Sequence, residues 1–119
     1  MKLTQGNRLL FIGDSVTDVD RVRPVAQGTL FNRLGRGYPH IVSGMINALY
    51  PELGINVINT GVSGDTARRL AARWQTDVID LHPDWLSVMI GINDVWRQFD
   101  SPCEPEQHVL LDEYESTLD

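Results

Sequence analysis

Three apolar runs are spaced along the chain, at residues 8–12, 55–59 and 85–92, and a glycine-containing turn comes at the end of each. Short apolar runs of this kind are typical of strands that are buried on both faces of a parallel sheet. The third run contains Val88, Met89 and Ile90 in succession, so we predict that it is the most buried of the three strands.

Helical patterns separate these strands. Apolar residues recur at helical spacing over residues 39–50, and a second helix is predicted over residues 65–76, with an acidic residue in its first turn. Residues 18–37 combine charged side chains with Gly and Pro, which predicts a long loop over the carboxyl edge of the sheet. Strand-helix-strand units joined by right-handed crossovers predict an α/β fold with a parallel sheet.

The last 22 residues differ in charge from the rest of the chain. The net charge is -6, but residues 1–97 hold all 10 basic and 9 of the 16 acidic residues, so the remaining residues hold 7 acids and no base. Pro105 between two acidic residues is typical of a helix entry, and apolar residues then recur at helical spacing as far as Leu118. No stop signal precedes Asp119, so we expect the chain to end inside a helix, as the N-terminal part of a longer domain.

A short polar motif follows or overlaps the end of each predicted strand. The motifs are residues 11–15 (FIGDS), 59–65 (NTGVSGD) and 91–94 (GIND). Because the carboxyl ends of parallel strands meet at one edge, where open α/β sheets bind ligands, we expect the three motifs to lie together. A serine there can act as a nucleophile, and backbone N–H groups and an asparagine amide can stabilise the oxyanion that forms. Together they fit acyl transfer.

Each motif also has a purely structural interpretation. Ser15 is of a residue type that commonly caps a helix, and Gly61 and Gly64 permit backbone conformations that other residues avoid. Asn93 is equally suited to a turn beside its acidic neighbour. Ser63 does not form a Gly-x-Ser-x-Gly elbow, because Asp65 stands where that motif requires glycine. Three such motifs in one order rarely coincide by chance, which favours the catalytic interpretation.

This ordered set resembles the SGNH hydrolases, also called the GDSL esterase and lipase family, over essentially the whole chain. The resemblance implies that Ser15 is the nucleophile and an oxyanion donor, that Gly64 supplies a second N–H, and that Asn93 donates through its side chain. It also implies a three-layer α/β/α flavodoxin-like fold, in which residues 1–119 form a single domain that lacks its C-terminal strands. The family's fourth block, Asp-x-x-His, has no counterpart in the chain.

Within the family, the amino-acid sequence of several stretches is similar to that of bacterial esterases that remove acetyl groups from xylan fragments. The stretches that carry this likeness are residues 11–18, 21–24, 72–74 and 83–98. The expected ligand is an acylated sugar or another small ester. We assign Asp14, Trp96 and Arg97 to the substrate pocket, although Asp14 also suits a role in organising the turn and Trp96 also suits packing beneath the loop.

A serine esterase needs a base, and the chain has three histidines. His82 precedes the third predicted strand, which places it at the amino end of the sheet, away from Ser15. His40 and His108 are expected on helix faces. A second hypothesis is therefore a fragment without a proton shuttle, which binds acylated sugars or has a structural role.

Composition argues against several other classes of protein. Cys103 is the only cysteine, which excludes an internal disulfide, and Asp18-Val19-Asp20 lacks a histidine pair, so we interpret it as part of a solvated loop rather than a metal site. An acidic chain with one lysine does not present a nucleic-acid surface, and no apolar run reaches membrane-spanning length. We expect a cytoplasmic protein that needs no metal or cofactor, and the sequence leaves its oligomeric state open, a homo-oligomer included.

Overall fold

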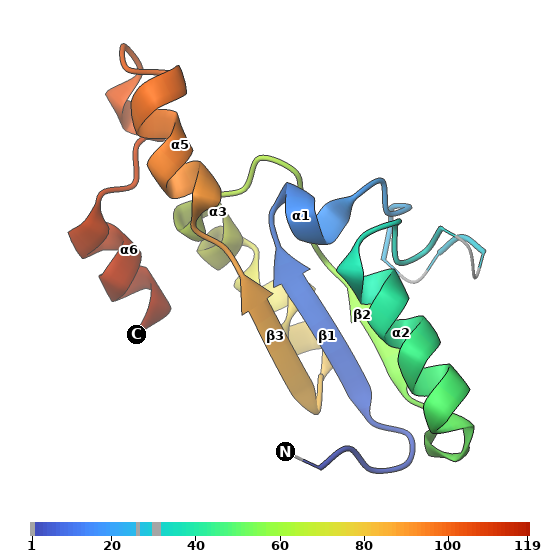
Figure 1. Ribbon diagram of the computed structural model, residues 1–119. Helices are drawn as coiled ribbons and strands as arrows, with labels where there is room; N and C mark the ends of the chain where they lie inside the picture. Colours follow the sequence, from blue (N-terminus) through green and yellow to red (C-terminus); the bar gives the residue numbers. More distant parts are fainter. Residues whose placement is uncertain (1, 26, 30–31) are drawn as a thin grey trace.

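The computed structural model describes residues 2–25, 27–29 and 32–119, and these residues form a parallel sheet of three strands (Figure 1). The strand order is β2-β1-β3, so the first strand in the sequence lies in the middle. The α/β fold predicted from the sequence is confirmed, and all three predicted strands are present: β1 (Arg8–Gly13), β2 (Asn56–Asn59) and β3 (Trp85–Met89).

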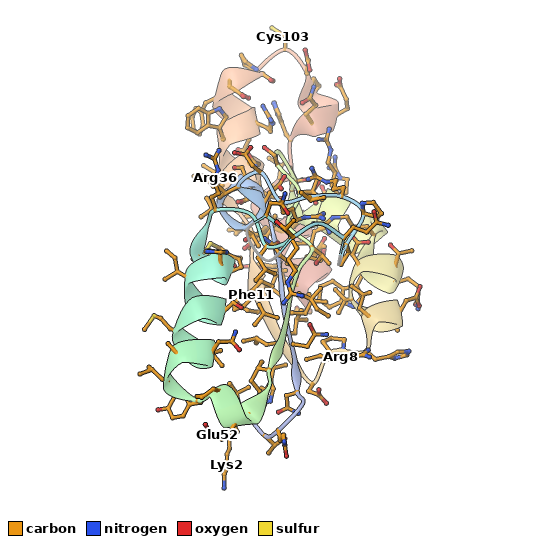
Figure 2. The ribbon with its side chains drawn as sticks, turned by 90° about the vertical axis from the view of Figure 1, so that its right-hand side faces the viewer. Lys2, Arg8, Phe11, Arg36, Glu52 and Cys103 are labelled. Carbon is orange, nitrogen blue, oxygen red and sulfur yellow. The ribbon has the colours of Figure 1, made fainter. Side chains whose placement is uncertain are left out.

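Helices lie on both faces of the sheet. Figure 2 shows α2 on one side of the strands and α3 and α4, the helices that directly follow β2, on the other. The helices are α1 (Ser15–Asp18), α2 (Tyr38–Leu49), α3 (Ala67–Ala72), α4 (Trp74–Asp77), α5 (Ile92–Asp100) and α6 (Leu111–Leu118), with three short 3₁₀ turns at Pro51–Leu53, Ile79–Leu81 and Pro105–Gln107. The arrangement is a three-layer α/β/α fold, as expected.

Two apolar cores fill the spaces between the layers. Because successive side chains of a strand point to opposite faces, Leu9 and Phe11 of β1 pack beneath α2, and Leu10 and Ile12 pack on the opposite face, together with Leu70 of α3. Leu10 and Ile12 are fully buried. The central strand is therefore the most buried of the three.

The prediction that the third strand is the most buried is wrong. β3 pairs with β1 alone among the described strands, and Val88 and Met89 are 41% and 44% exposed. On the side of α3, β3 borders an apolar groove of about 650 Å³ whose other walls include Trp74, Tyr114 and Leu118. An unbroken apolar run indicates two faces suited to burial, but the strand order decides which faces are covered.

Helix boundaries also differ from the predictions. The helix expected over residues 65–76 is interrupted at Arg73, which leaves the helical conformation and ends α3. The third strand was expected to extend as far as residue 92, but β3 ends at Met89. A helix that was not predicted, α5, begins at Ile92. The C-terminal segment is not one helix from Pro105, because residues 108–110 separate a 3₁₀ turn from α6.

Between α1 and α2, the predicted long loop is confirmed for the residues that the structure describes; residues 26, 30 and 31 lie outside them. Within the described residues, no helix is long and apolar enough to cross a membrane. The turn after α5 projects from the body of the molecule, with the exposed Cys103 at its tip (Figure 2).

Candidate active site

The three polar motifs meet at one edge of the sheet. The register of the strands pairs Gly13 of β1 with Met89 of β3, so these strands end side by side. The Val62 N–H of the second motif donates to the Gly13 carbonyl at 2.9 Å. The Asn93 amide of the third motif donates to the Asp65 carbonyl at 2.8 Å. Direct hydrogen bonds therefore join the first motif to the second and the second to the third.

Ser15 is the first residue of α1, directly after the strand end. The helix cap is Asp14, not Ser15, because the Asp14 carboxylate accepts a hydrogen bond from the Val16 N–H at 3.0 Å. Ser15 is exposed, and as the first helical residue it has an N–H that no carbonyl of the helix can accept. Asp14 is only 2% exposed, which matches the turn-organising role; its assignment to the substrate stays a prediction.

The second motif forms the turn between β2 and α3. Gly64 has a φ of +81°, in the left-handed region that favours glycine. Across the described ranges, no acceptor is hydrogen-bonded to the Gly64 N–H. Gly61 is required by close packing, because a Cβ on it would lie 2.5 Å from the Asp18 backbone nitrogen of α1. The structural interpretation of these glycines as conformationally permissive therefore fits Gly64, whereas Gly61 has no positive φ and is required by packing instead. The Gly64 N–H is available to a ligand.

Asn93 lies in the first turn of α5. Its bond to Asp65 uses one of its two amide hydrogens, which leaves the second for a ligand. The neighbouring Asp94 is buried, and its carboxylate accepts a hydrogen bond from the Ala67 N–H at the start of α3 at 2.9 Å. Burial raises the pKa of the Asp94 carboxyl above its ordinary value. Asp94 therefore anchors α5 to α3 and holds Asn93 beside the second motif.

The guanidinium of Arg73, which the sequence analysis did not assign to the site, links the first two motifs. Arg73 forms ion pairs with Asp65 and Asp77, both at 2.7 Å. It also donates to the carbonyls of Thr60 at 2.7 Å and Gly13 at 3.3 Å. Nothing local to Arg73 marks it for this role, because most of its partners are more than seven residues away in the sequence.

The two remaining candidate residues lie on α5. Arg97 is near the second motif, since a Cβ on Gly64 would be 3.7 Å from its Nη2, and it forms an ion pair with Asp100 at 2.6 Å. Trp96 is 58% exposed, so it does not pack beneath the loop. With Ile92, Val95 and Phe99, which are also exposed, it forms an apolar face of α5. Their roles toward a substrate stay predictions.

None of the three histidines is hydrogen-bonded to Ser15 in the part of the chain that the structure describes. His82 lies at the amino end of the sheet as expected, because two residues later Asp84 donates its N–H to the carbonyl of Arg8, the first residue of β1. His40 lies in the first turn of α2. The expectation that His108 lies on a helix face is wrong, because His108 lies in the extended segment between the 3₁₀ turn and α6, where it is hydrogen-bonded to the Ser101 carbonyl at 2.9 Å.

The prediction that residues 18–20 belong to a solvated loop is wrong for Asp18, which is the last residue of α1 and is buried. Asp20 is exposed, as predicted, and pairs with Arg36. Among the residues described, no group of three or more His, Cys, Asp or Glu side chains is arranged to hold a metal ion.

Comparisons with known proteins agree on a single family. Residues 11–119 match the model of the GDSL-like lipase/acylhydrolase family. The chain is 59% identical over 118 residues to an acetylxylan esterase from Geobacillus stearothermophilus, covering 99% of this chain and 53% of that protein. The crystal structure of that esterase is similar with a TM-score of 0.93. An alpha/beta hydrolase from the metagenome of Lake Arreo, Spain, is 48% identical, with a TM-score of 0.91, and the match covers 97% of this chain and 53% of that one.

Three other solved structures of the Geobacillus stearothermophilus esterase are described as catalytic mutants, in which a histidine, an aspartate or a serine is replaced by alanine. The chain spans about half the length of the relatives that it matches. The family match covers nearly all of the chain, and the fold and the order of the motifs agree with it. The chain belongs to the GDSL-like lipase/acylhydrolase family.

Proposed function

We propose that this chain carries the nucleophile and the oxyanion-binding side of a serine esterase that removes acetyl groups from carbohydrates such as xylo-oligosaccharides. The observation that supports this best is the gathering of three hydrogen-bond donors at one sheet edge. They are the N–H of Ser15 at the start of α1, the Gly64 N–H, which has no partner among the described residues, and the second amide hydrogen of Asn93. The 59% identity to an acetylxylan esterase supports the acetyl and carbohydrate parts of the proposal.

The reaction has two steps. Ser15 Oγ attacks the carbonyl carbon of the acetyl ester while its proton passes to a base, and the carbonyl oxygen becomes an oxyanion. Ser15, Gly64 and Asn93 donate hydrogen bonds to this oxyanion, which lowers the barrier because the donors are already in place. The tetrahedral intermediate collapses, the sugar hydroxyl leaves with a proton, and acetyl-Ser15 remains. Water then attacks the acetyl-enzyme by the same route and releases acetate. No metal or cofactor is needed.

The base is the part of the chemistry that the described residues do not provide. His40, His82 and His108 make no hydrogen bond to Ser15, and His82 is a strand length away. In the family that the motifs resemble, a histidine of an Asp-x-x-His block has this role. We infer that residues 1–119 form one domain together with the segment that carries such a block. This observation also favours a second candidate function, a chain that binds acylated sugars or serves a structural role without turnover.

Hydrolysis of p-nitrophenyl acetate and of acetylated xylobiose separates the two candidates. The variants are Ser15→Ala and, as a matched control, Ser116→Ala on α6, whose hydroxyl donates to the Glu113 carbonyl. Turnover that is lost in the first variant and retained in the second supports the esterase. Residues 1–119 alone, which lack the inferred base, are expected to hydrolyse neither ester. A folded protein that also carries the Asp-x-x-His segment, yet hydrolyses neither ester and resists labelling of Ser15 by a fluorophosphonate, contradicts the esterase and supports the second candidate.

A further inference from the structure

Two buried, oppositely charged side chains follow Ser15 and play no part in the chemistry described above. Asp18, the last residue of α1, is 4% exposed, and Arg21 is 6% exposed. Arg21 Nε lies 4.0 Å from Asp18 Oδ1, which is an ion-pair distance without a hydrogen bond. Burying two charges carries a large desolvation cost, so their other contacts must account for their presence.

Those contacts are with the turn that carries Gly64. Arg21 Nε donates to the Gly61 carbonyl at 2.5 Å, and the Ser63 N–H donates to Asp18 Oδ2 at 2.9 Å. Val62, between these residues, donates its N–H to the Gly13 carbonyl. Three successive residues of the turn, each hydrogen-bonded through a main-chain group, are therefore held from the side of β1 and α1, and the next residue is Gly64.

Asp18 and Arg21 thus form a clamp on residues 61–63 of the turn. α1 carries both the proposed nucleophile, Ser15, and Asp18 of this clamp. The helix has four residues, with Ser15 at its start and Asp18 at its end. The turn packs directly on the end of the helix, since a Cβ on Gly61 would lie 2.5 Å from the Asp18 nitrogen and 2.8 Å from the Thr17 carbonyl carbon. A shift of the turn against α1 would therefore move the Gly64 N–H relative to Ser15.

The clamp is incompletely hydrogen-bonded. Asp18 Oδ1 and Arg21 Nη1 are both buried without a hydrogen-bond partner among residues 2–25, 27–29 and 32–119. Arg23, half-exposed, supplies a second cation to Asp18 Oδ2 at 2.6 Å. Burial lowers the pKa of Arg21 from its ordinary value, so the fold disfavours its charge to some degree. If this pair served stability alone, both atoms would be expected to have hydrogen-bond partners. Functional sites, by contrast, commonly keep buried polar atoms that lack a partner, despite the energetic cost.

We propose that Asp18 and Arg21 are positioning residues that hold the Gly61–Gly64 turn so that the Gly64 N–H faces the oxyanion formed at Ser15. The proposal rests on the proposed esterase function for its catalytic consequence. The position of the Gly64 N–H is a separate, measurable property of the folded chain. Two independent readouts therefore distinguish a failure of this proposal from a failure of the esterase proposal.

The first readout is amide hydrogen exchange followed by two-dimensional NMR, which needs no turnover. The test variants are Asp18→Asn and Arg21→Lys. The control is Asp20→Asn, two residues after Asp18, which removes the same charge from an exposed ion pair with Arg36. Losing one charge-assisted hydrogen bond is expected to speed exchange at Ser63 by about tenfold or more in Asp18→Asn. The Gly64 N–H, which has no acceptor in the described ranges, is followed by its amide chemical shift in the same spectra, and this shift is expected to change. The amides of α2 and the control variant should keep wild-type rates.

The second readout is acetyl ester hydrolysis. Asp18→Asn is expected to lower kcat by about tenfold or more with little change in KM, because an oxyanion donor acts only in the transition state. Arg21→Lys keeps the charge and is expected to retain more activity than Arg21→Gln. This readout is made on protein that carries the segment with the inferred base. If that protein shows no turnover, the esterase proposal fails, and the NMR readout alone decides the positioning role.

Two outcomes would overturn the proposal. In the first, Asp18→Asn speeds exchange at Ser63 but leaves both the Gly64 amide chemical shift and any measurable kcat at wild-type values, which would make the pair a structural feature only. In the second, Asp18→Asn behaves like Asp20→Asn at every amide of the turn. Should Asp18→Asn fail to fold, the same comparison is made between Arg21→Lys and Asp20→Asn, with the same two outcomes decisive.

Discussion

Replacing Arg73 by alanine tests the contacts that join the first two motifs. Asp65, its first ion-pair partner, is only 5% exposed. Without Arg73 this carboxylate would be left buried and unpaired, which typically costs about 3–5 kcal/mol. Asp77 is more exposed and pairs with Arg73 one helical turn away, so its share is about 0.5 kcal/mol or less. The expected loss in the free energy of unfolding for Arg73→Ala is therefore about 3–5 kcal/mol.

The chain offers a matched control four residues earlier. Arg69 is exposed on α3, and its guanidinium has no hydrogen-bond partner in the described part of the chain. Arg69→Ala is expected to change stability by about 0.5 kcal/mol or less. Arg73→Lys keeps the charge but loses the planar fork that reaches several acceptors at once, so it should lie between the two alanine variants, at about 2 kcal/mol.

Urea unfolding followed by tryptophan fluorescence measures all three variants. With an m-value of about 2 kcal/mol/M, Arg73→Ala should unfold at a urea concentration about 1.5–2.5 M lower than the wild type, and Arg69→Ala at nearly the wild-type concentration. Equal midpoints for Arg73→Ala and Arg69→Ala would refute the reasoning. They would mean that the ion pairs of Arg73 merely offset their desolvation and that the turn is held by other contacts.

Three further predictions concern the elements around the site. Because burial raises the pKa of Asp94, its contribution to stability is present below about the ordinary value of 3.8 and is lost as the pH rises through the raised pKa. Asp94→Asn should therefore gain stability relative to the wild type between acid and neutral pH in urea unfolding, and a pH-independent difference would contradict this. The Arg68 guanidinium lowers the pKa of Glu113, so that its contribution is present above 4.5 and is lost as the pH falls through the lowered pKa. Glu113→Gln should speed hydrogen exchange in α6 at neutral pH, while the exposed Glu115→Gln should not, and equal rates would show that the pair does not hold α6 on α3. Gly13→Ala should be strongly destabilising, since its Cβ would lie 2.2 Å from the Met89 carbonyl oxygen, whereas Gly44→Ala in α2 meets no atom within 4 Å and should stabilise the helix by about 0.5–1 kcal/mol. Thermal unfolding that ranks these two variants the other way would refute the packing argument.

The strands and the meeting of the motifs could be predicted because both follow from local properties. An apolar run with a glycine turn at its end indicates a buried strand, and right-handed crossovers place the carboxyl ends of parallel strands at one edge. Ser15, Gly64 and Asn93 each follow such a run within a few residues. Their approximate location on the fold was therefore a consequence of sequence order.

The hydrogen-bonded network beneath the motifs depends on contacts between distant residues. Asp18 and Arg21 lie in a charged segment whose sequence is typical of a solvated loop. They are nevertheless buried, because the turn at Gly61 and Ser63, about 40 residues later, packs on the end of α1. Arg73 is likewise unremarkable within α3 and α4 until β1 and β2 bring Gly13 and Thr60 to it.

Burial was the other property that required the tertiary structure. The run Val88-Met89-Ile90 has the pattern of a central strand, but β1 occupies the centre and β3 lies beside it with one neighbour in the described sheet. The amino-acid sequence alone determined where strands form and which chemical groups stand at their ends, because hydrophobic pattern and turn residues act over a few positions. Only the tertiary structure decided which charges are buried and which donors remain free, because desolvation and hydrogen-bond partners depend on what packs against a residue from elsewhere in the chain.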